Sequence, residues 1–121
     1  MADERRCKRI AELIQREIGG LLLKHPKKLF FLKITLTAVT VSPDFSVAKV
    51  LFSVFDDVNP GEATKMLQNE ANFLRKELAR TINLRSTPRL IFIYDESIKR
   101  GQKLTALIDA AIAADEEQHH E

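Results

Sequence analysis

The sequence predicts a single α+β domain in which helices cover one face of a three-stranded sheet, followed by a C-terminal helix and tail. Long stretches repeat apolar residues every three or four positions, as amphipathic helices do, whereas shorter runs alternate or stay continuously apolar, as strands do. The order is helix, strand, strand, long helix, strand and C-terminal helix, which fits two packed layers. With 121 residues, 45% of them hydrophobic, the chain can bury the core of one domain.

The first helix is predicted over residues 4–24, where the apolar side chains fall on one face. Gly19 and Gly20 weaken this helix, and we interpret them as room for the close approach of another backbone. The helix should end at His25-Pro26, because the residue before a proline avoids the helical conformation. The apolar face consists of Cys7, Ile10, Ala11, Ile14, Ile18, Leu21 and Leu22.

A β-hairpin is predicted after the first helix. Its first strand, residues 31–42, carries apolar residues at both parities, so a bulge near Thr37-Ala38 is needed to bring them to one face. Residues 42–45 supply the turn, with a proline of fixed φ and an aspartate as a local acceptor. The second strand, residues 46–55, alternates regularly. Its inward set is Ala48, Val50, Phe52 and Val54.

A second amphipathic helix is predicted over residues 61–83. A third strand follows over residues 89–95, and its continuous apolar run predicts burial on both faces. A last apolar stripe over residues 103–114 predicts the C-terminal helix, beyond which the chain should fray. We therefore divide the chain into a domain of residues 1–103 and a helix and tail of residues 104–121. The stripe of the second helix is Ala63, Leu67, Ala71, Leu74, Leu78 and Ile82.

Charge is distributed unevenly along the chain. The net charge is only +2, but residues 104–121 contain five acidic residues and no lysine or arginine. Residues 1–103 therefore hold 19 basic and 12 acidic residues, a formal charge of +7. A basic body favours an anionic partner, usually nucleic acid, although an ordinary solvated surface explains the same charge about equally well. We expect the acidic tail to lie outside any RNA-binding surface.

Residues that could carry catalysis or bind a metal are scattered. A metal site needs clustered ligands, and the sequence has no glycine-rich phosphate loop, nucleophile elbow or zinc-protease motif. Cys7 lies on the apolar face of the first helix, where a core position is a simpler interpretation than a nucleophile. Asp95-Glu96-Ser97 fits a turn and helix cap better than an active site. We therefore expect no enzyme activity, no cofactor and no metal. The scattered metal-binding side chains are Cys7, His25, His119 and His120.

Targeting signals are not visible in the sequence. No stretch reaches the length of a membrane span, the first residues are charged rather than apolar, and a single cysteine excludes an intramolecular disulfide. We expect a cytoplasmic protein that does not bind membranes.

The basic residues form three groups: one in the first turns of the first helix, one flanking Pro26, and one along and just after the second helix. Cations and amides on one ridge can contact phosphates and 2′-hydroxyls. Glu62, Glu70 and Glu77 interleave the third group, so a solvated face is an equal alternative. Most phenylalanines fit core positions, which favours recognition of RNA shape and backbone over base stacking. The candidate RNA-binding residues are Arg5, Arg6, Lys8, Arg9, Lys27, Lys28, Lys65, Asn72, Arg75, Lys76, Arg80 and Arg85.

Several strings resemble those of one family, ribosome-binding factor A, a bacterial maturation factor of the small ribosomal subunit. They occur in the family's order from residue 6 to about residue 108, and their joint order and spacing are far more specific than any one string. The strings are Arg6-Cys7-Lys8-Arg9-Ile10-Ala11, Val41-Ser42-Pro43-Asp44-Phe45-Ser46 with Ala48-Lys49-Val50, Phe73-Leu74-Arg75-Lys76-Glu77-Leu78 through Leu84-Arg85 and Thr87-Pro88, and Asp95-Glu96-Ser97 with Gly101 and Leu104.

The resemblance implies a type II KH-like fold, with the order α-β-β-α-kink-α-β. It also implies a non-catalytic, cytoplasmic assembly factor that is a monomer when free and matters most in the cold. Such a factor binds the immature small (30S) ribosomal subunit and its 16S rRNA, and assists late maturation and processing of the rRNA 5′ end. DNA and membranes are not expected partners.

One segment departs from the family pattern. KH domains carry a Gly-x-x-Gly loop between two helices, and this family replaces it with a kink carrying Ala-x-Gly. The matching residues here are Glu70-Ala71-Asn72. Because asparagine tolerates the left-handed conformation that a glycine would use, we expect the kink at Asn72.

Two other classes of function stay open at this point. The first is a protein–protein adaptor that uses the third strand and the C-terminal acidic helix. The second, weaker alternative is a small enzyme centred on Asp95 and Ser97.

Overall fold

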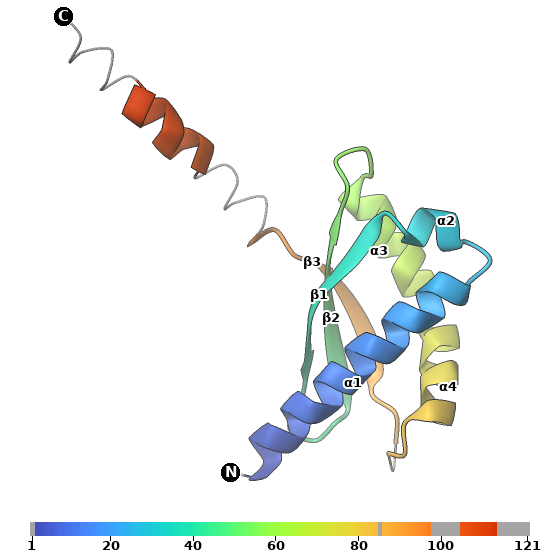
Figure 1. The fold of residues 1–121 in the computed structure, drawn as a ribbon. Coiled ribbons are helices and arrows are strands. Elements are labelled where there is room, and N and C mark those ends of the chain that lie inside the picture. The colour runs from blue at the N-terminus through green and yellow to red at the C-terminus, as the bar shows by residue number, and fades with distance from the viewer. Residues whose placement is uncertain (1, 85, 98–104, 114–121) are drawn as a thin grey trace, which may run out of the picture.

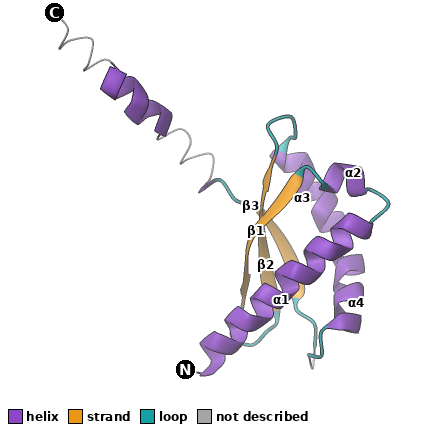
Figure 2. Cartoon of the chain, viewed as in Figure 1, coloured by secondary structure: helices purple, strands orange, loops and turns teal. Residues whose placement is uncertain are grey.

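The computed structural model describes residues 2–84, 86–97 and 105–113. In these ranges the chain folds as two layers, with the helices on one side of a sheet (Figures 1 and 2). Residues 105–113 form a further helix beyond this body, as the apolar stripe predicted. The elements of the body are α1 (Ala2–Lys24), α2 (Lys28–Phe31), β1 (Ile34–Val41), β2 (Val47–Val54), α3 (Pro60–Asn69), α4 (Ala71–Thr81) and β3 (Arg89–Tyr94).

The sheet has the order β1-β2-β3, in which β2 pairs antiparallel with β1 and parallel with β3. The register between β1 and β2 shifts between Leu36 and Ala38, so the predicted bulge is confirmed. The bulge places Leu36 opposite Phe52 and Val39 opposite Val50. Both parities of apolar residues in β1 therefore reach the same side of the sheet, as the sequence pattern requires.

The core lies between the sheet and the helices. Alternation in β2 buries Ala48, Val50 and Phe52 completely, whereas Lys49 is exposed on the opposite, uncovered face. The inward residues of the helices follow the predicted stripes. The fully buried helical side chains are Ile14, Ile18, Ala63, Leu67, Leu74 and Leu78.

The predicted single helix over residues 61–83 is two helices. α3 ends at Asn69 and α4 begins at Ala71, with Glu70 between them at φ −90° and ψ −1°. The backbone N–H of Glu70 is shared between the carbonyl oxygens of Met66 and Leu67, so the last turn of α3 tightens toward 3₁₀ geometry there. The kink that the family resemblance implies for this segment is present, but not at the expected Asn72, which lies within α4. Among the described residues, Phe45 is the non-glycine residue with positive φ. The bend occurs two residues earlier, without a left-handed residue.

Three smaller expectations also need correction. β3 is not buried on both faces, because Ile93 points to the uncovered side of the sheet and is 38% exposed. Gly19 and Gly20 do not admit another backbone, since a methyl group built at either would meet nothing within 4 Å. A short helix, α2, was not predicted where the sequence suggested the start of a strand.

Within the described residues, no helix combines the length and apolar character that crossing a membrane requires.

Candidate nucleic-acid interface

The outer flank of α4 brings together part of the predicted RNA-binding set. Asn72, Arg75 and Lys76 are exposed and line a shallow surface depression with Ala79 and Thr87. Their three- and four-residue spacing puts them on one side of the helix. Thr87 belongs to the connector before β3, so the depression lies between the helix and the chain that follows it.

Arg75 is fixed at the edge of this depression. Its Nε–H donates to the backbone oxygen of Thr87 at 3.1 Å, which orients the guanidinium and leaves its other N–H groups available. A positioned guanidinium next to a lysine and an amide can bind a phosphate and adjacent hydroxyl groups. The flank of α4 therefore has the chemistry of a backbone-binding site.

The other candidate RNA-binding residues on α3 and α4 do not lie on this flank of α4. Arg80 lies farther round α4, where its Nη1 pairs with Glu77 Oε1 at 3.4 Å. Both side chains belong to the same helix and Arg80 is highly exposed, so this pair contributes little to stability. Lys65 is exposed on α3, on the other side of the bend at Glu70. Arg85 lies outside the described residues.

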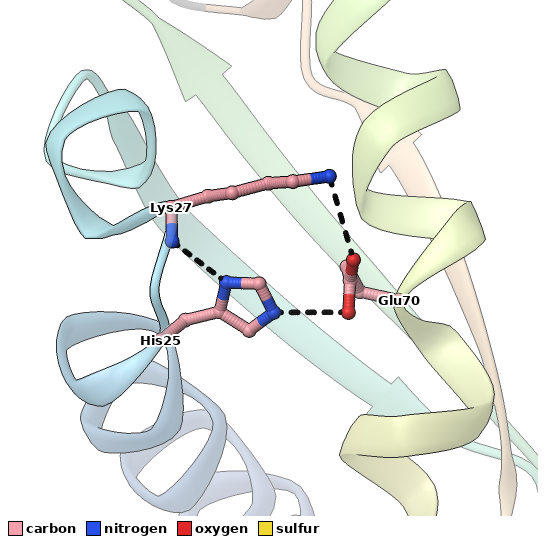
Figure 3. Close-up of polar contacts among 3 residues, drawn as sticks. All are labelled: His25, Lys27 and Glu70. Carbon is pink, nitrogen blue, oxygen red and sulfur yellow. Dashed lines mark hydrogen bonds and ion pairs between the residues drawn. The ribbon is translucent and has the colours of Figure 1, made fainter.

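The basic group that flanks Pro26 meets the α3–α4 segment at the bend. The loop between α1 and α2 carries His25 and Lys27, and both contact Glu70 (Figure 3). His25 Nε2 is 3.0 Å from Glu70 Oε2, and Lys27 Nζ is 3.8 Å from Glu70 Oε1. Lys28 is exposed at the start of α2. The fold thus joins two groups that are separate in the sequence.

The N-terminal group lies near the other end of the 23-residue helix α1, roughly 23–29 Å from Lys24 along the helix axis at a rise of about 1.5 Å per residue. Arg5, Lys8 and Arg9 are exposed there. Arg6 is engaged within the protein, because its guanidinium lies 5.2 Å from the centroid of the Phe45 ring in the β1–β2 turn. The structure therefore does not combine all predicted cations into one surface.

The turn beside Arg6 is held by its own side chains. Ser46 Oγ and Ser42 Oγ donate to Asp44 Oδ1 at 2.7 and 2.8 Å, and the N–H of Ser46 donates to the same atom. These hydrogen bonds, led by that of the Ser46 side chain, lower the pKa of Asp44 from 3.8 to about 2. Asp44 is thus a negatively charged turn residue at neutral pH.

Sequence reasoning missed one cation, Arg89, and one pair of side chains, His25 and Glu70. Arg89 is exposed at the start of β3, and its N–H donates to the Ser46 oxygen, which places this cation beside the β1–β2 turn. His25 and Glu70 were assigned no joint role, since 45 positions separate them and no local spacing pattern relates such residues. Arg89 could have been found from the sequence. A charged residue at the first position of an apolar strand is expected to lie at the exposed end of that strand.

The side chains considered as metal ligands in the sequence do not come together in the described part of the chain. There, no three or more His, Cys, Asp and Glu side chains gather in a way that could hold a metal ion. Cys7 is half-buried, with its Sγ 3.9 Å from the Ser42 oxygen, so it packs between α1 and the hairpin turn. His119 and His120 lie outside the described residues.

Comparison with known proteins gives consistent results. The family model of ribosome-binding factor A matches residues 6–108. The ribosome-binding factor A of Coxiella burnetii (strain RSA 493 / Nine Mile phase I) is 40% identical over 111 residues, covering 92% of this chain and 93% of the relative. That of Nitrosospira multiformis is 43% identical over 114 residues, covering 93% and 90%.

Solved structures agree with the fold. The crystal structure of ribosome-binding factor A from Thermus thermophilus superposes with a TM-score of 0.63 at 26% identity, covering 73% of this chain and 94% of that one. A homology model of the Thermus thermophilus protein, fitted into the cryo-EM map of a 30S complex, gives a TM-score of 0.59 at 27% identity, covering 71% and 91%. The family match extends over most of the chain, and the α+β architecture with its three-stranded mixed sheet is shared. The chain belongs to the ribosome-binding factor A family.

Proposed function

We propose that this protein is a non-catalytic ribosome assembly factor that binds the immature 30S subunit and its 16S rRNA. The observation that carries the proposal is family membership, together with the complex of the 30S subunit and the related Thermus thermophilus protein. Assistance in late maturation and rRNA 5′-end processing, with greatest importance in the cold, forms part of the proposal. A factor that acts on ribosomes works in the cytoplasm, and we propose that it is a monomer when free.

The basic surface at the helix bend supports RNA as the ligand. Asn72, Arg75 and Lys76 line one depression on α4, and Lys27 contacts Glu70 at the bend where α4 begins. We propose that this surface contacts rRNA phosphates and hydroxyls, with the N-terminal group as a second contact. Preferential binding to one RNA conformation would stabilise an assembly intermediate without any chemical step. Residues 1–103 then form the RNA-binding domain, and residues 104–121 a separate acidic helix and tail.

Sedimentation tests the proposal directly. Cell extract is separated on a sucrose gradient at low salt and the protein is detected across the fractions. We expect it with the small-subunit fraction, and its absence there would contradict the proposal. Binding to purified subunits should weaken steeply as salt rises, since each phosphate contact adds about −0.7 to −0.9 to the log–log slope. A flat response would exclude a phosphate-based interface.

An adaptor function is the second candidate, favoured by exposed apolar side chains near the C-terminal end. Ile93 lies on the uncovered face of the sheet, and the helix over residues 105–113 exposes Leu107, Ile108 and Ile112. A chain truncated after Ala106, which lacks all three of these helical side chains, separates the two proposals. If truncation abolishes association with the subunit but leaves binding to isolated rRNA unchanged, the C-terminal segment contacts a protein partner. Unchanged association would exclude that role.

A further inference from the structure

The two helices that meet at the bend begin in different ways. α3 is capped by its own chain, because Asn59 Oδ1 accepts a hydrogen bond from the N–H of Glu62 at 3.1 Å. Glu70 stands at the start of α4, but its side chain makes no capping bond to that helix. The carboxylate extends instead toward the loop after α1 (Figure 3). The start of α4 is therefore held by a distant segment.

His25 forms the other side of this contact, and its hydrogen bonds fix its tautomer. The backbone N–H of Lys27 donates to Nδ1 at 3.0 Å, so Nδ1 carries no proton. In a neutral imidazole the proton is then on Nε2, which donates to Glu70 Oε2. The contact is thus a hydrogen bond from a neutral histidine to a carboxylate, which is stronger than one between two neutral groups.

Packing leaves the histidine ring little freedom. Its side chain is only 8% exposed. The ring meets Phe31 of α2 and Phe73 of α4 edge to face, with centroids 5.1 and 5.8 Å apart. His25 is therefore held between two helices while it donates to the residue at the bend. A displaced α4 would lose both the ring contact and the hydrogen bond.

We infer that Glu70 is a positioning residue for RNA binding: its hydrogen bond with His25 holds the start of α4 against the α1–α2 loop, and so fixes Asn72 and Lys76 of α4 relative to Lys27 of the loop. The inference rests on the proposed function. A surface that is ordered before binding loses less conformational entropy on binding, and so binds more tightly. The second oxygen of Glu70, 3.8 Å from Lys27 Nζ, adds a weak restraint on that lysine.

Electrostatics alone predicts the opposite effect. Glu70 is a negative charge within a basic surface, so its removal should strengthen the attraction for phosphates. Loss of positioning should weaken binding instead. The sign of the change on removing the carboxylate therefore decides between a positioning residue and a mere repulsive charge.

The first experiment compares Glu70→Ala with Glu77→Ala in the full chain. Both remove one carboxylate from the same helical segment, but the ion pair that Glu77 makes among the described residues is local, with Arg80 of its own helix. Equilibrium binding to purified bacterial small ribosomal subunits is measured at constant salt, well below the melting temperature of each variant. We expect Glu70→Ala to bind about tenfold more weakly, equivalent to about 1.4 kcal/mol. Glu77→Ala should bind as tightly as the wild type or more tightly. Glu70→Ala binding at wild-type strength or above would overturn the inference.

Conservative variants separate positioning from general destabilisation. Glu70→Gln retains an oxygen that can accept from His25 Nε2–H, so its binding should stay within about twofold of the wild type. His25→Phe keeps a ring between Phe31 and Phe73 but removes the hydrogen bond, so it should weaken binding as Glu70→Ala does. The double variant His25→Phe, Glu70→Ala should bind no more weakly than either single variant. Additive effects of the two changes would mean that the residues act independently.

Imidazole NMR provides a readout that does not depend on RNA. In the wild type, the ¹⁵N shifts of His25 should report the Nε2–H tautomer, and in Glu70→Ala they should move toward a mixture of tautomers. Amide shifts should change at Asn72 and Lys76 but not in the β1–β2 turn. If the wild type does not bind the subunit, the proposed function fails. If it binds and the Glu70 and His25 variants bind equally well, only the positioning role fails.

Discussion

The β1–β2 turn and the α3–α4 bend are both held by a carboxylate that accepts hydrogen bonds, but the donors come from very different distances along the chain. In the turn, the donors to Asp44 are Ser42 and Ser46, two residues away on either side. At the bend, the donor to Glu70 is His25, 45 residues away. Asp44 is exposed, whereas Glu70 is 20% exposed against a histidine that is 8% exposed.

This difference has consequences for energy and for function. An exposed network exchanges its hydrogen bonds with water at little net gain, and it survives changes elsewhere because its donors are chain neighbours. A partly buried network has a larger effect when broken, since the remaining group stays desolvated. The bend also lies within the basic surface and the turn lies at the far end of α1. Perturbing the bend should therefore affect stability and binding together, and perturbing the turn should affect neither strongly.

The largest expected effect follows from His25→Ala. The variant loses two aromatic edge contacts and leaves the Glu70 carboxylate without its donor, so we expect the free energy of unfolding to fall by about 2–3 kcal/mol. Urea denaturation measures the change as a lower midpoint at constant slope. The matched control is Asp44→Ala, which should lower the midpoint less. An equal or greater loss in the control would remove the distinction between the two regions.

Charge reversal on α4 should have the next largest effect, on binding. Lys76→Glu removes a cation from the depression beside the bend, and we expect about tenfold weaker binding to the small subunit, or about 1.4 kcal/mol. Lys49→Glu makes the same change on the uncovered face of the sheet and serves as the control. Filter binding at fixed salt compares the two. Equal losses would show that net charge, rather than this surface, governs binding.

A purely local change in α1, the helix that precedes the His25 loop, should stabilise the protein. Gly20 is exposed within α1, and a methyl group there meets nothing within 4 Å. Gly20→Ala should therefore raise the free energy of unfolding by up to about 1 kcal/mol, because alanine loses less backbone entropy in a helix. Thermal denaturation checks the sign, and binding to the subunit should not change. A lower melting temperature would indicate a contact at this position.

The smallest effect is the acid response of the turn. The pKa of Asp44 is about 2 in the folded chain and 3.8 as the ordinary value, so its ionised form is favoured by folding. This contribution is present above about pH 3.8 and disappears as the pH falls from about 3.8 to about 2. A ¹³C titration of the Asp44 carboxyl group should give a midpoint near 2, and Ser46→Ala should raise it. A midpoint near 3.8 in the wild type would mean that the turn network does not persist in solution.

The parts of this protein that depend on near neighbours along the chain could be predicted from the amino-acid sequence alone. Alternation and opposed parities predicted the hairpin and its bulge at Thr37-Ala38, because a strand side chain can reach only one face. Periodic stripes predicted the helices and most of the core, and Pro26 predicted the end of α1. The ordered strings predicted the family, which the matches over residues 6–108 confirm.

The position of the helix bend and the grouping of the cations depend on how the elements pack together. The family pattern and the tolerance of asparagine for the left-handed conformation pointed to Asn72, but the break falls at Glu70, whose side chain pairs with His25 across the fold. Likewise, the apolar run of β3 did not reveal that one of its faces stays uncovered, because that depends on where the helices pack. Local sequence fixes a residue's periodicity and conformational preferences. Contacts between distant residues, such as that of His25 with Glu70 across 45 positions, are set by packing. Packing also assembles the surface that we propose binds RNA.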